Sequence, residues 1–499
     1  MREPLLDLGR RTAWSVVWAM LGTGAAKLIV LGSLAVLARL LAPAEFGLFA
    51  FAVVYIAYLE TIGDLGAGAA LIYWRERTTD VAQVTFVLNL VVGLAWFALT
   101  WGIAPSVAGF FQTPAGTPIL RALGIAFVLK ALGNTHDSLC RKDLRFKARL
   151  VPETGLAVVK AAVTVTFAAW GFGVWSLVWG HLAATGARSA LLWIVVPWRP
   201  TWRWPVGLLG PVLRYGRWIV VVNALAAIVH HADYVIVGRA LGMTALGWYQ
   251  MAYKLPEALV IVLAWQASMV LFPAFSRAGA SGHSVANSYL TALRYLALLA
   301  VPIALGLFFL AEPLVLTLFG DAWRPSIPLL RALAVYAGLR ALSAPGGDIL
   351  KAQGRPHLLA ALGTVKALVL VPALLVAARW GTLAIAGTLA AVAGVTLLLN
   401  VAVLRFAAGL TVRATLGALR PTLAPTLVLA GVLFAWTRLS AGEASLVVLA
   451  GGLALGMSVY LVTALVSSPD LGRHALAVLR GVRPRAGGAV DAEVARAVG

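Results

Sequence analysis

The segment RLLAPAEFGLFAFA, residues 39–52, has a counterpart 200 positions later in RALGMTALGWYQMA, residues 239–252. The two copies share an arginine, a leucine, a glycine and an alanine at equivalent places. Charged residues inside apolar runs match as well, at offsets of 206 and 210: Arg121 with Arg331, Lys130 with Arg340, and Lys160 with Lys366. Alanine and leucine matches are common in this composition, but charged residues in phase within apolar helices are not. The chain therefore contains an internal repeat.

The composition is that of a membrane protein. Of the 499 residues, 61% are hydrophobic and only 12% are charged, whereas soluble proteins carry about 25% charged residues. Apolar runs of twenty or more residues recur between residues 13 and 466, and each is long enough to cross ~30 Å of hydrocarbon as a helix. The sequence has no ten-residue segments of alternating polarity, which mark an outer-membrane barrel. We therefore predict an all-α polytopic membrane protein.

Glycine, proline and charged clusters divide the apolar sequence into about fourteen predicted transmembrane helices. The first apolar stretch is far longer than the core of a secretion signal, so we expect it to be the first of these helices. The predicted helices span residues 13–41, 46–73, 81–102, 117–136, 150–171, 173–197, 217–241, 246–275, 287–311, 324–347, 357–378, 381–404, 422–438 and 445–467.

The repeat unit contains six of these helices, so both copies enter the membrane in the same direction. We expect two pseudo-symmetric six-helix lobes, related by an axis along the membrane normal, with the substrate path between them. The last two helices lie outside the repeat. The expected domains are an N-terminal lobe (1–197), a C-terminal lobe (198–421), an extra helix pair (422–467) and a basic cytoplasmic tail (468–499).

Basic residues are distributed unevenly between the predicted loops. One set of connections holds 26 Lys and Arg residues, and the opposite set holds only five. Because cytoplasmic loops of membrane proteins carry excess Lys and Arg, both termini are predicted to be cytoplasmic. The same rule accounts for the net charge of +21, so we do not expect nucleic acid as a partner.

Several lysines fall deep inside predicted helices, where a charged group costs ~2.5–3.5 kcal/mol even on permissive scales. Each either lines a wet cavity or belongs to a structural ion pair. The turn of the first predicted hairpin puts Lys27 level with Glu60, and the turn near residue 243 puts Asp233 level with Lys254. The deep lysines are Lys27, Lys160, Lys254 and Lys366, and the acids Asp64 and Glu257 lie near them in the sequence.

Two histidines, His230 and His231, precede Asp233 by one helical turn or less. They are either hydrogen-bonding core residues or members of a proton relay with that acid. A metal site is not expected, because no cluster of ligands has suitable spacing, and no cofactor is expected either. Tyr249 and Tyr253 lie on the same predicted helix as Lys254, which makes them candidates to line a cavity.

Several stretches resemble one family. Residues 37–47, LARLLAPAEFG, are similar to the first hairpin of bacterial polysaccharide-unit flippases, and residues 62–66, IGDLG, resemble their second helix. Asp233–Arg239, Phe319–Trp323 and Ala352–Arg355 resemble later landmarks, so the likeness covers roughly residues 10–405. It implies the oligosaccharide-flippase branch of the multidrug/oligosaccharidyl-lipid/polysaccharide exporter superfamily. The substrate that it implies is an undecaprenyl-diphosphate-linked repeat unit of O-antigen, capsule or exopolysaccharide.

We therefore expect a flippase of the bacterial inner membrane that moves this unit from the cytoplasmic to the periplasmic leaflet by alternating access. Its expected partners are the lipid-linked oligosaccharide, membrane lipids and a polysaccharide polymerase machinery. Two alternatives stay open: a cation-coupled drug-type exporter and an integral-membrane glycan-processing enzyme. A lysine rather than an acid in the first helix argues against the first, and short non-cytoplasmic loops without paired carboxylates argue against the second.

The candidate site is predicted from the negative charge of a diphosphate. In hydrocarbon this charge must be neutralised by cations of the protein, because burying an unpaired charge is costly. Lys27 and Lys254 are the expected principal ligands, while Lys366 is expected to be a structural partner. The other expected substrate-binding residues are Tyr249, Tyr253, Lys160 and Arg340. The residues expected to hold the lysines charged or to couple transport to protons are Glu60, Asp64, Asp233, His230 and His231.

Overall fold

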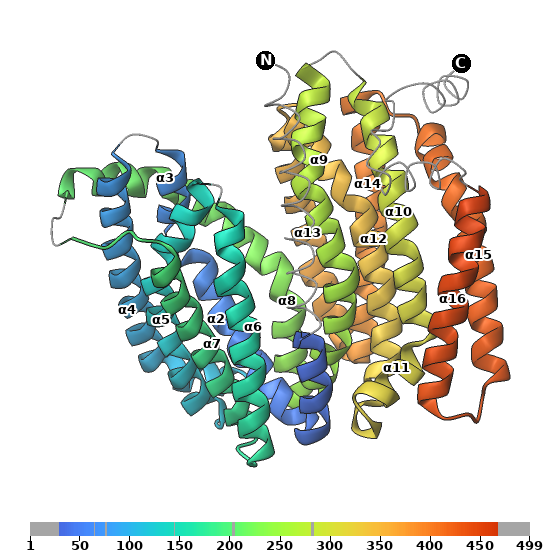
Figure 1. Ribbon diagram of the computed structural model, residues 1–499, viewed down its shortest axis with the longest axis horizontal. Helices are drawn as coiled ribbons and strands as arrows, with labels where there is room; N and C mark the ends of the chain where they lie inside the picture. Colours follow the sequence, from blue (N-terminus) through green and yellow to red (C-terminus); the bar gives the residue numbers. More distant parts are fainter. Residues whose placement is uncertain are drawn as a thin grey trace. The chain divides into compact units, whose positions relative to one another are not determined.

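The structure is a computed structural model that describes residues 29–63, 65–74, 77–143, 145–201, 205–280 and 284–467. In these residues all regular secondary structure is helical (Figure 1). Eleven of the helices are long and apolar enough to cross a membrane. The predicted class, a multi-pass helical membrane protein, is therefore confirmed for the described part of the chain.

The contacts divide the chain into two compact units, Met1–Gln250 and Met251–Gly499. In the first unit α4 packs beside α5, α6 packs beside α7, and α5 also contacts α2, α3 and α7. The described elements of this unit are Ile29–Leu40, α2 (Pro43–Ile62), α3 (Ala67–Tyr73), α4 (Thr78–Phe110), α5 (Gly116–Lys142), α6 (Phe146–Ala169), α7 (Val174–Val195), η1 (Val206–Leu208) and most of α8 (Leu209–Pro256).

The second predicted helix, residues 46–73, is broken into α2 and α3. Leu65 and Gly66 between them have positive φ angles of 49° and 74°. Gly66 lies against the backbone of Gly216 near the start of α8, and a methyl group added to Gly66 would come within 2.5 Å of the Gly216 Cα. Only glycine accepts both the left-handed backbone and this close approach. The uninterrupted helix expected from hydropathy was therefore wrong at this point.

The helix α8 is divided by Gly242, whose backbone (φ 85°, ψ 175°) is not helical. This break matches the turn expected near residue 243. It is followed by Pro256, a π-helical turn over Glu257–Ile261, and α9 (Val262–Ala280). Proline has no N–H to donate to the hydrogen bonds of a helix. The π-helical turn begins directly after Pro256, where one of these hydrogen bonds is missing.

Two glycines at matched repeat positions meet within the first unit. A methyl group on Gly47 of α2 would come within 1.7 Å of the Met243 carbonyl oxygen, and one on Gly247 of α8 would come within 1.9 Å of the Pro43 carbonyl oxygen. The contact is reciprocal, because each glycine faces the backbone four residues before the other. Small residues at crossings of this kind let transmembrane helices approach to backbone contact.

In the second unit α12 is the central helix and contacts α9, α10 and α14, while α15 packs against α16 and α10. Figure 1 shows α15 and α16 lying side by side. The elements after α9 are α10 (Val285–Phe309), α11 (Ala311–Leu318), η3 (Asp321–Trp323), α12 (Ser326–Ala352), α13 (Pro356–Ala377), η4 (Ala378–Trp380), α14 (Thr382–Ala408), α15 (Val412–Leu439) and α16 (Ser445–Ser467).

Candidate functional site

An inter-helix ion pair lies inside the first unit. The Lys130 Nζ on α5 is 2.7 Å from the Glu60 Oε2 on α2. Both side chains border a cavity of about 20 Å³ together with Asn89 and Trp96 of α4, which is room for about one water molecule. The Asn89 carboxamide oxygen and the Trp96 Nε1 are buried there without a hydrogen-bond partner among the described residues. The cavity is therefore polar on several sides.

The ion pair of Glu60 with Lys130 was not predicted from the sequence. The turn of the first hairpin puts Glu60 level with Lys27, but Lys27 lies outside the described residues, as does Asp64, so that placement stays a prediction. Symmetry about a hairpin turn gives the depth of a residue in the membrane but not the rotation of its helix, so it cannot predict a contact with α5.

A histidine lies close to both cations of the first unit. His181 on α7 is within electrostatic reach of Lys160 on α6 and of Lys130, and its ring meets the Phe49 ring at a centroid distance of 6.2 Å. No pattern in the sequence pointed to His181. The two repeat-matched lysines of this unit thus share one histidine within their electrostatic reach.

Asp233 belongs to a buried aromatic cluster on α8. The Tyr249 hydroxyl donates a 2.7 Å hydrogen bond to the Asp233 Oδ2, and both side chains are buried. The His231 ring lies 5.6 Å from the Tyr58 ring of α2, whereas His230 is exposed. In this conformation Tyr249 positions Asp233 rather than lining a cavity. Of the two candidate relay histidines, His231 is the one packed into the cluster.

The second unit holds a different set of charges. The Lys254 Nζ is 3.1 Å from the Glu257 Oε2, and both side chains are about two-fifths exposed (41% and 43%). This pair spans Pro256 and ends on the first residue of the π-helical turn. Single π-turns within α-helices are frequent at functional sites. Lys254 is therefore accessible to a ligand and next to an irregular backbone.

Arg340 is held by tyrosines. Its guanidinium donates to the Tyr336 hydroxyl at 2.8 Å and to the Tyr253 hydroxyl at 3.4 Å. Lys366 on α13 lies within electrostatic reach of Arg340. No acid of the described chain lies within 4 Å of Lys366, so its expected role as a structural ion-pair partner is not supported. In this unit too, the repeat-matched cations lie within electrostatic reach of each other.

A network of ion pairs connects α5, α6 and α7. The Arg188 side chain on α7 is 15% exposed and pairs with Asp137 at 3.2 Å and with Glu153 at 3.1 Å. Asp137 also pairs with Arg149 and Arg141. Cys140 is buried on α5. The described residues contain no group of three or more His, Cys, Asp or Glu that could hold a metal.

Comparison with known proteins identifies the family. Residues 36–328 match the polysaccharide biosynthesis protein family. This chain belongs to that family. The resemblance inferred from the first hairpin is thereby confirmed.

Two relatives cover most of the chain. The succinoglycan biosynthesis transport protein ExoT of Rhizobium meliloti (strain 1021) is 25% identical and covers 97% of this chain and 98% of its own length. The lipopolysaccharide biosynthesis protein WzxC of Escherichia coli (strain K12) is 25% identical over 79% of this chain and 78% of its own length. Both relatives are named for the biosynthesis of a polysaccharide or lipopolysaccharide, and ExoT is named as a transport protein. Their names favour a transporter over a glycan-processing enzyme.

The fold is that of a solved flippase. The lipid II flippase MurJ in an inward closed conformation superposes with a TM-score of 0.74, covering 91% of this chain and 99% of that chain at 14% identity. At this identity the likeness establishes the fold and leaves the substrate open.

Proposed function

We propose that the protein flips an undecaprenyl-diphosphate-linked oligosaccharide from the cytoplasmic to the periplasmic leaflet, for synthesis of O-antigen, capsule or exopolysaccharide. Membership of the polysaccharide biosynthesis protein family and a relative named as a succinoglycan transport protein support this substrate class. The fold, which is shared with a lipid II flippase, is one that can carry out lipid flipping. A polysaccharide polymerase machinery is the proposed receiving partner.

The observation that carries the proposal is that the repeat-matched cations lie within electrostatic reach of a shared partner or of each other. Lys130 and Lys160 both lie within electrostatic reach of His181 in the first unit, and Lys366 lies within electrostatic reach of Arg340 in the second. Cations inside transmembrane helices are costly and mark substrate or ion pathways. A diphosphate in hydrocarbon needs such cations, because an unpaired ion loses its hydration there without compensation. The polyprenyl tail has no such need and can stay in lipid.

The proposed ligands of the diphosphate are Lys254, Arg340 and Lys366, with Lys27 and Lys160 contributed by the first lobe. Tyr253 hydrogen bonds to Arg340 and is proposed to orient it. The acids Glu60, Asp64 and Asp233 are proposed to keep the lysines charged when no substrate is bound, with His230 and His231 as the proton relay. Alternating access is proposed as a rocking of two lobes.

The proposed topology has fourteen spans, both termini in the cytoplasm, and lobes at 1–197 and 198–421 with an extra pair at 422–467. It combines the eleven apolar helices with Ile29–Leu40, α7 and a second crossing created by the break at Gly242. Reporter fusions after Arg145 and after Gln112 should report cytoplasm and periplasm respectively. Two reporters on the same side would exclude this topology.

Transport by purified protein in vesicles tests the substrate directly. A fluorescent polyprenyl-diphosphate sugar should cross, whereas a panel of cationic drugs should not; the reverse result would favour the drug-type exporter. The Lys254→Gln variant should lose transport while keeping expression and folding. If the Lys27→Gln, Lys254→Gln double variant still exports polymer normally in cells, these lysines are not the diphosphate ligands.

A further inference from the structure

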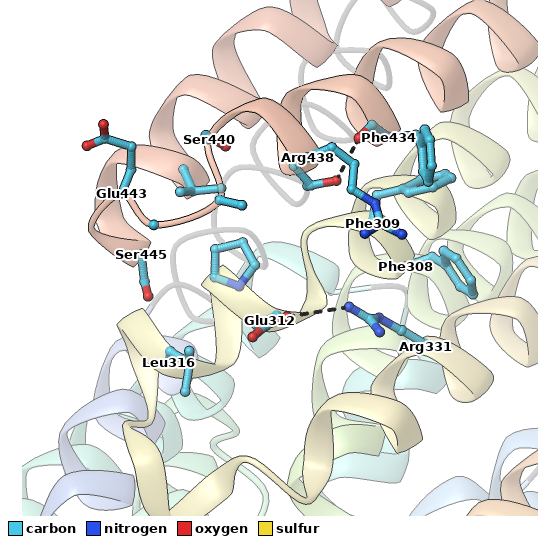
Figure 2. A pocket seen from close by; sticks show the side chains of 15 residues that line it. Phe308, Phe309, Glu312, Leu316, Arg331, Phe434, Arg438, Ser440, Glu443 and Ser445 are labelled. Atoms are coloured by element: carbon cyan, nitrogen blue, oxygen red, sulfur yellow. Dashed lines mark hydrogen bonds and ion pairs between the residues drawn. The ribbon is translucent and has the colours of Figure 1, made fainter.

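A cavity in the second unit lies away from the charges discussed so far. It has a volume of about 620 Å³ within the second unit, between the α10–α11 corner, α12 and the loop that joins α15 to α16. Arg331 comes from α12, Arg438 from the last turn of α15, and Glu312 from α11. Figure 2 shows both guanidinium groups turned toward the part of the pocket beside Phe309, with Glu443 at the opposite rim.

The arginines have hydrogen-bonding capacity to spare. The Arg331 Nη2 is 3.8 Å from the Glu312 Oε2, which is too long for a hydrogen bond. Arg438 lies over the Phe434 ring at 5.4 Å. Neither guanidinium donates a hydrogen bond within the described residues, although each carries five N–H donors. Two planar forks directed into one pocket suit a phosphate group, which arginine binds in a bidentate manner.

The pocket also offers negative charge. Glu312 and Glu443 border it together with the two arginines, so its four charged side chains sum to zero. A purely anionic ligand would meet two carboxylates, and a purely cationic one would meet two guanidinium groups. A ligand that carries both a phosphate and an ammonium satisfies all four.

The position of the pocket indicates a lipid. Its walls are the ends of three membrane-spanning segments, Val285–Phe309, Val412–Leu439 and Ser445–Ser467, and helix ends reach the headgroup level of a bilayer. Phe434 lines the pocket, and Leu446 and Val447 lie in the sequence between its lining residues Ser445 and Val448. These three side chains are more than half exposed (52%, 64% and 52%). They offer an apolar surface to the acyl chains of a lipid whose headgroup is held in the pocket.

We propose that this pocket binds the headgroup of a zwitterionic phospholipid, with the phosphate between Arg331 and Arg438 and the ammonium at the Glu312 and Glu443 side. The bound lipid would join the α15–α16 pair to α10, α11 and α12. The site is independent of the transported substrate, and it would hold its lipid whichever molecule the protein moves.

The test uses the full chain, purified in detergent and stripped of lipid. Phosphatidylethanolamine should raise its melting temperature and remain bound in native mass spectrometry, since a ligand of the folded state stabilises it. The Arg331→Gln, Arg438→Gln variant should weaken this binding by about tenfold or more. The matched control is Arg379→Gln, which removes an exposed arginine outside the pocket and should leave binding unchanged.

Further arms separate the ligand classes. Phosphatidylglycerol, which has the phosphate without the ammonium, should bind more weakly, and Glu443→Gln on the exposed loop should reduce that preference even if the double arginine variant does not fold. Equal binding by wild type and the arginine variant would overturn the proposal. So would stabilisation by soluble phosphoethanolamine alone, which would indicate a free phosphate ester. Competition by a neutral alkyl glycoside that is lost in the arginine variant would instead identify a sugar site.

Discussion

The two units carry cations at matched positions but surround them differently. In the first unit Lys130 pairs with a carboxylate on another helix, Glu60, at 2.7 Å. In the second unit its counterpart Arg340 donates to the hydroxyls of Tyr336 and Tyr253. The positions of the charges are thus repeated, while the partners are not. A carboxylate cancels a positive charge and a tyrosine hydroxyl only orients it, so the second cluster is better suited to meet an incoming diphosphate.

Removing the second cluster should have the largest effect. We expect Arg340→Gln, Lys366→Gln to lower transport of a fluorescent polyprenyl-diphosphate sugar by on the order of a hundredfold, because each hydrogen bond to a charged group contributes ~1.5–3 kcal/mol. Arg413→Gln, at an exposed arginine that begins α15, is the matched control and should transport normally. Unchanged transport by a folded double variant would mean that the diphosphate is bound elsewhere.

The contact between α2 and α8 at Gly47 and Gly247 tests how closely the two matched segments of the repeat approach each other. Gly47→Ala should lower the melting temperature, because its methyl group would meet the Met243 carbonyl oxygen and separating packed helices costs ~1–3 kcal/mol. Gly247→Ala should do the same through Pro43. Gly210→Ala, where nothing lies within 4 Å of the added atom, should leave the melting temperature unchanged or higher. A tolerated Gly47→Ala would contradict the backbone contact.

The Glu60–Lys130 pair sharpens the comparison, because its carboxylate already neutralises the lysine and so stabilises the contact between α2 and α5. Glu60→Gln and Lys130→Gln should each lower the melting temperature, and the double variant should recover part of the loss. A double-mutant cycle for residues in contact gives coupling of ~0.5–3 kcal/mol. Transport should fall less in this double variant than in the Arg340→Gln, Lys366→Gln variant, because Lys130 is not among the proposed diphosphate ligands. If it falls as far as in the Arg340→Gln, Lys366→Gln variant, the two clusters share one function.

Much of the helical framework could be predicted because it depends on local sequence. The apolar run expected at 81–102 contains the core of α4, and the run at 445–467 coincides with α16. The break at Leu65 and Gly66 could not be predicted, because it depends on the approach of Gly216, which is distant in the sequence. Hydropathy counts residues per span and carries no information on such contacts.

The site could be predicted only in part. Lys160, Arg340 and Lys254 could be predicted as candidates from their position inside predicted transmembrane helices alone. A charged side chain in hydrocarbon is costly, and such residues usually mark a substrate or ion pathway. Their partners depend on the rotation of each helix about its axis, which hairpin symmetry does not determine. For this reason the contact of Glu60 with Lys130 and the position of His181 within electrostatic reach of two lysines were not predicted. The placement of Glu60 level with Lys27 stays a prediction, because Lys27 lies outside the described residues.

The smallest expected effect concerns a helix connection that differs between the halves. Gln112 follows α4 with a φ of 55°, and Gly320 follows α11 in the second half with a φ of 90°. A non-glycine residue in the left-handed region costs ~1–2 kcal/mol, so Gln112→Gly should raise the melting temperature by about 1–2 °C. Gly320→Ala should lower the melting temperature, because alanine is strained at a φ of 90°. The added methyl group itself would meet nothing within 4 Å, so the loss would measure the backbone strain alone. If Gln112→Gly is destabilising, the glutamine side chain stabilises the turn by more than its backbone conformation costs, and the two connections are not equivalent.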